Sequence, residues 1–312
     1  MTDAVYLSFM PDRHAFGISE DEIEKIIAAG KQPKIMIAPD DWKKLNPSAS
    51  SPNARPLIAF LMGRENGFYL MLENYVRALA QTGVDLKILT HCDGPDALND
   101  VDGLILPGRL DDPLNTFAAP SLPKKPVLCS LTYVNMVREA EKRGIPVLGI
   151  AAGAKIIGRL HGIRPLRSPS DDRSRLRVKS LKLLSVFPET ELYRIMGNVR
   201  KMKIYSVDEP HLQVDAKSDM KIYAVSGDVP EAWGKENILC VRWEPEDVSV
   251  DADKYTLNVY KWLEKKAKEH QKSVRGKKDT HNGRYTPPQH PHIQKTPYCA
   301  HSEVWVDKQP LR

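Results

Sequence analysis

The feature that most constrains the fold is a regular alternation of short apolar runs and amphipathic segments that begins at Pro56. Continuous apolar runs of this length are typical of parallel strands buried on both faces, and the segments between them have the periodicity of helices. Gly83, Gly144 and Gly162 each stand where such a helix would end. We expect strands at residues 57–62, 84–89, 101–106 and 146–150, and helices at 68–81, 134–143 and 152–161. This succession predicts a doubly wound sheet with right-handed crossovers.

The pattern changes after Gly162. Residues 164–177 are polar and include Pro165 and Pro169, which indicates a long loop. Shorter apolar segments follow, and we expect strands at 178–186, 202–207, 221–226 and 238–243 and a closing helix at 255–269. The predicted fold class is therefore α/β: a doubly wound, mostly parallel sheet flanked by helices, with an antiparallel strand extension.

Two segments flank this domain. Residues 19–29 form a predicted amphipathic helix that opens with the capping pair Ser19 and Glu22, and a loop rich in Pro, Asn and Ser leads from it to the first strand. We therefore divide the chain into an N-terminal helix and linker (1–55), a main domain (56–264) and a C-terminal tail (265–312). The helix has an apolar isoleucine face, so we expect it to dock as an accessory element.

The tail carries the excess of positive charge. The chain has 46 Lys and Arg against 40 Asp and Glu, a net charge of +6, and the stretch from Glu264 to Arg312 has 11 basic and 5 acidic residues. Because this stretch has several prolines and few large apolar residues, we predict that the tail is mostly disordered. A basic tail can bind an anionic partner such as nucleic acid, although such tails are more often only a solvated end.

Cysteine usage and apolar runs bear on location. The four cysteines have no CxxC spacing, which favours reduced thiols and gives no sign of a metal site. Cys129 and Cys240 fall in apolar patterns, so we interpret them as core residues. No apolar run reaches the length of a membrane span, and no secretory pattern opens the chain. We predict a cytoplasmic protein that holds no metal and no cofactor and does not enter a membrane.

Two turns stand where ligands bind in such sheets, beyond the carboxyl ends of the strands. They comprise residues 103–113 and 144–155. The second is a strand–elbow–helix in which small residues surround Ala151. A side chain at such an elbow projects over a helix N-terminus, where exposed amides stabilise an anion or lower the pKa of a thiol. The alternative is a tight turn whose small residues serve only close packing.

At these turns the chain resembles a known family. Residues 103–113 are similar to the Asp-Gly-Leu-Leu-Leu-Pro-Gly-Gly-Gly-Asp-Val-Asp-Pro stretch of the gamma-glutamyl-gamma-aminobutyrate hydrolase family of class I glutamine amidotransferases. Residues 144–155 resemble its Gly-x-Pro-Val-Leu-Gly-Ile-Cys-Arg-Gly-Met-Gln elbow, and residues 238–247 its Val-Gln-Trp-His-Pro-Glu motif. The resemblance covers residues 56–263. It implies a flavodoxin-like sheet and a cysteine that attacks a gamma-glutamyl amide, with a histidine base and an orienting glutamate.

The reactive positions of that family are altered in this chain. The nucleophile falls on Ala151 and the base on Glu244, whereas the orienting glutamate is kept as Glu246. Arg109 stands at the second glycine of the oxyanion turn, where an arginine side chain would tend to fill the space that a ligand approaches. The resemblance therefore implies a degenerate triad.

The resemblance also implies a set of ligand-binding positions. The family has a His-His pair near the substrate, and His211 and Gln213 are displaced candidates for it, with a surface loop as the alternative interpretation. The implied ligand-binding residues are Gly108, Arg109, Asp111, Ala152, His211 and Gln213.

Three functions are compatible with this pattern. In the first, the chain is a pseudoenzyme whose cleft above Ala151 binds a small molecule or a protein without cysteine chemistry. In the second, carboxylates perform acid–base work in the same cleft, as the pair Glu244 and Glu246 or as Glu246 with Asp111 or Asp112. In the third, the basic tail binds an anionic partner and the domain is its scaffold.

Overall fold

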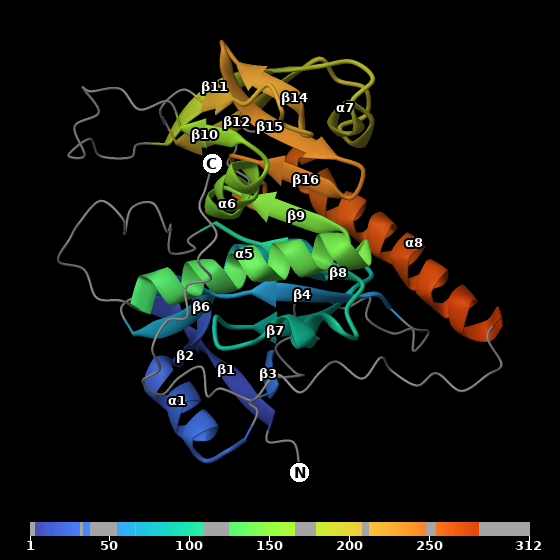
Figure 1. Cartoon of the computed structure of the whole chain (residues 1–312). Coiled ribbons are helices and arrows are strands. Elements are labelled where there is room, and N and C mark those ends of the chain that lie inside the picture. Colours follow the sequence, from blue (N-terminus) through green and yellow to red (C-terminus); the bar gives the residue numbers. More distant parts are fainter. Residues whose placement is uncertain are drawn as a thin grey trace, which may run out of the picture.

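The computed structural model describes residues 4–31, 34–37, 55–65, 67–108, 125–165, 179–207, 212–247 and 254–280. Figure 1 shows a large twisted sheet with helices against its faces and a smaller sheet beside one end of it. The layers are those of an α/β domain, in which each helix buries one apolar stripe against a sheet.

A nine-stranded sheet forms the centre of the molecule, with the strand order β12-β11-β14-β15-β16-β9-β8-β4-β7. Its parallel half comprises β4 (Leu57–Leu61), β7 (Asp85–Leu89), β8 (Gly103–Leu106), β9 (Val147–Ile150) and β16 (Ile238–Val241). The antiparallel half comprises β11 (Lys179–Val186), β12 (Lys201–Val207), β14 (Lys221–Ser226) and β15 (Val229–Lys235). The predicted fold class is confirmed, including the antiparallel extension.

Two apolar cores lie on the two faces of this sheet. One is covered by α5 (Lys125–Arg143) and α6 (Ala152–Leu160), which bury Tyr133, Val137 and Ile157. The other is covered by α3 (Glu73–Ala80), α7 (Glu191–Ile195) and α8 (Asn258–Thr280), with buried side chains that include Val76, Leu192 and Trp262. Because both faces are covered, the central strands β8, β9 and β16 are apolar along their whole length.

The N-terminal segment contributes strands as well as the predicted helix. A five-stranded sheet has the order β3-β1-β2-β6-β5 and comprises β1 (Ala4–Met10), β2 (Ala15–Ser19), β3 (Lys34–Ile37), β5 (Gly63–Glu65) and β6 (Phe68–Leu72). α1 (Glu20–Ala28) begins as predicted, because the Ser19 side chain accepts a hydrogen bond from the Glu22 amide. Its Ile23 is fully buried in the main core. The first three strands were not predicted, and the boundary at residue 55 divides this sheet.

Two predicted elements need correction. Residues 68–72 form β6 and not the first turns of a helix, because they pair with β2, and α3 begins only at Glu73. α8 continues to Thr280, so the predicted disorder of the tail is wrong as far as that residue. Residues 281–312 lie outside the described part of the chain.

Short elements complete the described residues: the 3₁₀ turns η1 (Pro11–Arg13), η2 (Pro95–Leu98) and η3 (Lys254–Leu257), and a two-stranded sheet of β10 (Ile163–Pro165) and β13 (Leu212–Val214). Among the helices that the structure describes, none combines the length and the apolar character that a membrane span requires.

Candidate functional site

The elbow at Ala151 joins β9 to α6 through an unusual backbone conformation. Ala151 has φ 47° and ψ −106°, outside the regions that an L-residue adopts without strain. Its amide donates to the Val241 carbonyl at 2.8 Å, and the Gly153 amide donates to the Pro107 carbonyl at 3.1 Å. Neighbouring strands therefore hold the elbow on both sides, and the Ala151 side chain stands at the start of α6.

Glycines allow the close approach that this elbow needs. A Cβ on Gly153 would lie 2.6 Å from the Leu106 carbonyl carbon, so any side chain there would collide with β8. A Cβ on Gly149 would lie 2.7 Å from the end of Ile157 and 3.0 Å from the Ala154 Cα. The small residues of the motif therefore serve helix–sheet packing as well as the elbow itself.

Three sequence-predicted residues meet above the elbow. Gly108, Ala151 and Glu244 follow β8, β9 and β16, which are neighbours in the sheet and end at the same edge. A Cβ placed on Gly108 would be 3.3 Å from Glu244 Oε1 and 3.5 Å from the Ala151 Cβ. The position opposite the glutamate is thus a methyl group, which cannot act as a nucleophile.

Glu244 is engaged in an ion pair. Its carboxylate and that of Asp247 both accept hydrogen bonds from the Lys179 ammonium group at the start of β11, at 2.6 Å for Asp247. Partial burial alone would lower the pKa of Lys179, but these two carboxylates outweigh it and raise that pKa. Lys179 therefore stays charged near neutral pH, and Glu244 has a cation beside it.

Glu246 lies beneath this pair and is buried, with 7% of its surface exposed. The Tyr260 hydroxyl donates to its Oε2 at 2.7 Å, and a hydrogen bond from the Tyr75 hydroxyl also lowers its pKa. Burial raises the pKa of Glu246 to about 7, against the opposing effect of its hydrogen bonds. The carboxyl group is therefore poised between its neutral and charged forms at physiological pH.

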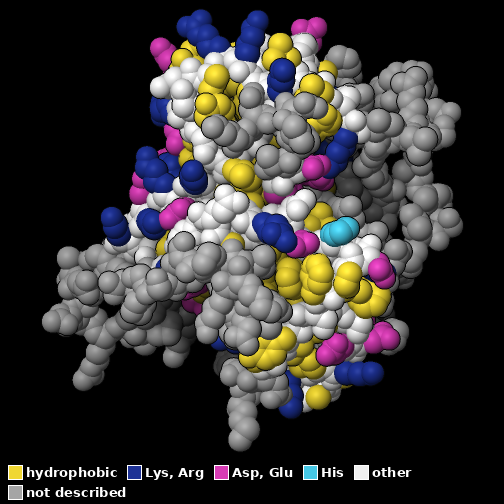
Figure 2. Space-filling model, turned by 180° about the vertical axis from the view of Figure 1, so that it is seen from behind, with side chains coloured by type: hydrophobic (Ala, Val, Ile, Leu, Met, Phe, Trp, Pro, Cys, Tyr) yellow, Lys and Arg dark blue, Asp and Glu magenta, His cyan; other side chains and the backbone are white. Residues whose placement is uncertain are grey.

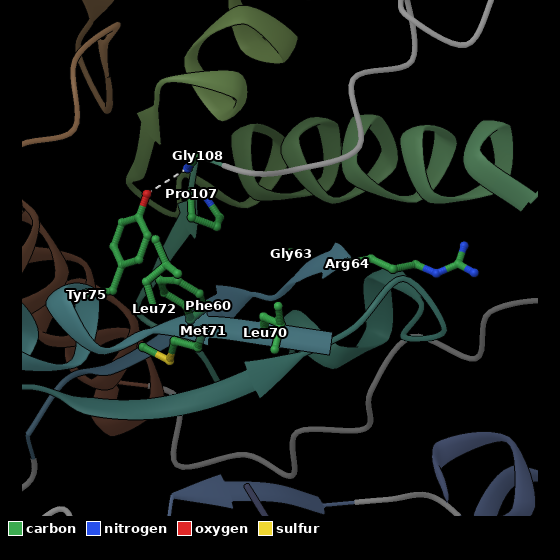
Figure 3. A pocket seen from close by; sticks show the side chains of 9 residues that line it. All are labelled: Phe60, Gly63, Arg64, Leu70, Met71, Leu72, Tyr75, Pro107 and Gly108. Atoms are coloured by element: carbon green, nitrogen blue, oxygen red, sulfur yellow. Dashed lines mark hydrogen bonds between the residues drawn. The ribbon is translucent and has the colours of Figure 1, made fainter. Parts of the chain in front are cut away.

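Tyr75 of α3 closes the site from the other side. Its hydroxyl accepts a hydrogen bond from the Gly108 amide at 2.8 Å, and burial and the nearby Glu246 raise the pKa of Tyr75. Figure 3 shows this hydroxyl directed at Gly108 across a small pocket that is also lined by Phe60, Leu70 and Pro107. The pocket measures about 20 Å³, which is room for a single water and not for an amino acid.

Of the other predicted ligand-binding residues, the structure describes two, Ala152 at the elbow and Gln213 on β13. Arg109, Asp111 and His211 lie outside the described residues. Gln213 is exposed on β13, opposite Arg164 of β10. Ala152 is the first residue of α6, where it packs partly buried against the core of that face.

Sequence reasoning missed three residues of the site. Tyr75 and Tyr260 had the spacing of core positions on their helices, and nothing in the pattern indicated that their hydroxyl groups face Gly108 and Glu246. Lys179 lies more than sixty positions before its partner Glu244, as one of many lysines in the chain. The one available signal was the acidic pair Glu244 and Asp247, which requires a cation if it is partly buried.

Comparisons with known proteins agree with this architecture. No family model matches the chain. It is 34% identical over 122 residues to phosphoribosylformylglycinamidine synthase subunit PurQ of Haloquadratum walsbyi, a match that covers 38% of this chain and 50% of that protein. The chain thus matches about half the length of this curated relative.

Two solved structures resemble this chain, and the one with the higher TM-score supports the fold. A candidate GMP synthase subunit from Thermoplasma acidophilum superposes with a TM-score of 0.52 and 14% identity, over 72% of this chain and all of that one. The PurLQS structure from Thermotoga maritima covers 67% of this chain and 98% of its own, with a TM-score of 0.49 and 15% identity. With the sheet order and the elbow described above, the chain has the fold of the class I glutamine amidotransferases.

Proposed function

We propose that this chain is a glutamine amidotransferase-like pseudoenzyme that binds a ligand without cysteine chemistry. The observation that carries the proposal is the methyl group of Ala151 at φ 47°, in the place that a nucleophile would occupy. Thioester formation needs a thiolate at this position. The strained backbone of the elbow remains, but no atom at its tip can attack a carbonyl group.

The surrounding groups support the same conclusion. Glu244 stands where a general base would be needed and is paired with the ammonium group of Lys179. Glu246 would orient a histidine in a working triad, whereas here its Oε2 accepts from Tyr260. A carboxylate with a permanent cation beside it does not take up and return a proton near neutral pH as an imidazole does.

The proposed ligand site lies above Ala151, beyond the small pocket beside Gly108, and its occupant is a small molecule or a protein. The kinship with PurQ, which belongs to a synthase, favours a protein partner as one of the two occupants. The resemblance of residues 103–113 and 144–155 to the gamma-glutamyl-gamma-aminobutyrate hydrolase family favours a gamma-glutamyl compound as the other. A cytoplasmic location is part of the same proposal.

The decisive experiment is a glutamate-release assay with glutamine and gamma-glutamyl amides. We expect no release by the unmodified protein. Ala151→Cys alone should remain inactive because the base is still absent, whereas Ala151→Cys combined with Glu244→His should give a trace of glutamyl adduct, detectable by mass spectrometry. Calorimetric titration with the same compounds separates the occupants, since binding without turnover indicates a small-molecule site and the absence of binding directs the search to a protein.

One observation favours the carboxylate hydrolase as a second candidate: Glu246 has a pKa of about 7, the value that suits a general acid or base near neutral pH. This alternative predicts glutamate release that survives thiol-blocking reagents and is lost in Glu246→Gln. Release with these properties would overturn the pseudoenzyme proposal.

The anionic partner of the basic tail stays a prediction. The described part of the tail is the end of α8, where Lys265 and Lys268 are exposed. Figure 2 shows Lys and Arg side chains at the top of the molecule and down the side that α8 occupies. Truncation before Lys265, with binding to nucleic acid measured across a salt series, would test it.

A further inference from the structure

A second group of reactive side chains lies at the same edge of the sheet. His91 and Cys92 belong to the turn that follows β7, and Tyr69 reaches them from β6. The Tyr69 hydroxyl lies 2.8 Å from His91 Nδ1, and the Cys92 thiol lies 3.7 Å from His91 Nε2. The same hydroxyl is 3.7 Å from Cys92 Sγ. The imidazole thus connects a phenol to a thiol, and the three side chains form a closed triangle.

The polar atoms of this triangle fit two states. In the neutral state the thiol proton points to His91 Nε2 and the ring donates from Nδ1 to the Tyr69 oxygen. If the thiol proton moves to His91 Nε2, the sulfur becomes a thiolate beside an imidazolium and accepts a hydrogen bond from the Tyr69 hydroxyl. A nearby cation and a hydrogen-bond donor both favour the charged form of a thiol.

The surrounding structure holds this triangle in place. Tyr69 is 2% exposed and its ring lies 5.5 Å from the His91 ring. The Thr132 hydroxyl of α5 donates to the His91 carbonyl at 3.0 Å, and the Cys92 amide donates to the Thr90 hydroxyl at 3.2 Å. Cys92 itself is only half-buried, so a small reagent can reach it.

Cys240 shows what the triangle adds. Cys240 is fully buried in β16, and desolvation raises the pKa of its thiol, which makes it an unreactive core residue. Cys92 differs in having both a basic partner and partial exposure. It is also separate from the elbow, because β4 and β8 lie between β7 and β9 in the sheet.

We propose that Cys92 is a reactive thiol, activated by His91 and Tyr69, whose substrates are small hydroperoxides. In the step proposed, the thiolate attacks one peroxide oxygen, an S–O bond forms and the O–O bond breaks. The leaving hydroxide or alkoxide takes the proton from His91 Nε2 and departs as water or an alcohol. Sulfur is oxidised by two electrons to a sulfenic acid, and the peroxide is reduced. The donors beside the sulfur suit a leaving oxyanion, which is why this class of electrophile fits the site.

Alkylation of the full-length native protein tests the proposal. The rate at which iodoacetamide modifies Cys92, followed peptide by peptide by mass spectrometry from pH 5 to 10, should have a midpoint at least about one unit below the 8.5 of an ordinary thiol. Cys240 in the same samples should react at least about tenfold more slowly, because its buried thiol is protected. Hydrogen peroxide should give a sulfenic acid at Cys92 that dimedone traps.

Two variants assign the activation to its source. His91→Gln should move the midpoint up to the ordinary value and slow alkylation at pH 7 about tenfold, because the thiolate fraction falls. Tyr69→Phe should move it in the same direction by less, and His161→Gln, at the far end of α6, should leave it unchanged. Circular dichroism checks that each variant is folded. If His91→Gln does not fold, the wild-type profile and Tyr69→Phe decide.

Several results would overturn the inference. A wild-type midpoint at or above 8.5 would show that the thiol is not activated. Equal rates for Cys92 and Cys240, or a profile that Tyr69→Phe and His91→Gln both leave unchanged, would show that the triangle is only a packing arrangement. An activated thiol that gives no dimedone adduct with peroxide would remove hydroperoxides as the substrate class. None of these results depends on Ala151, so the pseudoenzyme proposal stands or falls separately.

Discussion

Two turns at one edge of the central sheet differ in what they offer: one has an unusual backbone and the other has a group of reactive side chains. The elbow after β9 has a strained backbone at Ala151 and carries only a methyl group at its tip. The turn after β7 matches none of the motifs in the sequence, yet it brings together a thiol, an imidazole and a phenol. Recognition by motif therefore finds the first and overlooks the second.

The difference arises from what holds each turn. Packing fixes the elbow, since α6 lies so close to β8 that Gly153 can carry no side chain. Side-chain hydrogen bonds fix the turn after β7, where the Asp93 carboxylate accepts from the Thr90 amide at 2.7 Å and from its hydroxyl at 3.1 Å. A geometry that rests on packing persists when its chemistry is lost, whereas one that rests on a few polar contacts changes with a single substitution.

The packing at the elbow should give the largest effect. Gly153→Ala introduces a Cβ that meets the Leu106 backbone, and we expect a loss of at least about 3 kcal/mol in the free energy of unfolding, measured by urea denaturation. Gly94→Ala is the matched control because nothing lies within 4 Å of its Cβ position, and it should change stability by less than about 1 kcal/mol. Similar values for the two variants would mean that packing does not fix the elbow.

The buried carboxyl group beneath the elbow should make stability depend on pH. The pKa of Glu246 is about 7 in the folded chain against 4.5 for an ordinary glutamate, so the folded state holds the proton more tightly. The stability that protonation provides is complete below about pH 4.5 and is lost as pH rises to 7, a decline of about 3 kcal/mol.

Glu246→Gln isolates this contribution because it keeps the shape and removes the charge. We expect the variant to match the wild type at pH 5 and to exceed its stability at pH 8 by on the order of 1–3 kcal/mol, in urea melts at the two pH values. Parallel pH profiles for the two proteins would show that Glu246 is not desolvated as the structure indicates.

In the turn after β7, the Asp93 carboxylate should stabilise the fold through its hydrogen bonds with Thr90. Asp93→Ala leaves the buried Thr90 amide without its acceptor, and we expect a loss of about 1–3 kcal/mol in stability. The alkylation rate of Cys92 should fall as well, because the turn no longer fixes His91 against Tyr69. Asp96→Ala, exposed in the neighbouring η2, should alter neither quantity. A stable Asp93→Ala with unchanged Cys92 reactivity would contradict the comparison.

The sequence predicted the parallel half of the fold well because its strands are covered on both faces. β4, β8 and β9 are apolar from end to end, and the glycines that end the helices between them are equally plain. The N-terminal strands could not be predicted from the pattern, because exposed and buried residues alternate only irregularly along β1. Their sheet is also completed by β6, which pairs with β2 and lies far along the chain. Residues 68–72 are predicted as helix because a short apolar run gives no periodicity that distinguishes a strand from the start of the helix that follows it.

The residues of the candidate site also differ in whether the sequence alone can place them. Gly108, Ala151 and Glu244 could be placed from the sequence because each follows a strand, and neighbouring parallel strands end at one edge. Tyr75 and Lys179 could not, since each reaches the site from another element and only the packing of α3 and β11 brings them there. The contacts among His91, Cys92 and Tyr69 could not be predicted either, because Tyr69 lies in β6, where the sequence predicts a helix.

The smallest predicted effect separates strain from chemistry at the elbow itself. Ala151 is held at φ 47° and ψ −106°, which costs an alanine about 1–3 kcal/mol, whereas glycine adopts such angles freely. Ala151→Gly should therefore stabilise the protein, by about 1 kcal/mol after the greater freedom of glycine in the unfolded chain is subtracted. Ala154→Gly removes the same methyl group from the helical backbone of α6 and should instead cost about 1 kcal/mol or more. The two variants can be compared by thermal and urea denaturation under one condition. Opposite signs would show that the backbone of the elbow is strained at Ala151, and equal losses would show that Ala151 is relaxed and that the turn serves packing alone.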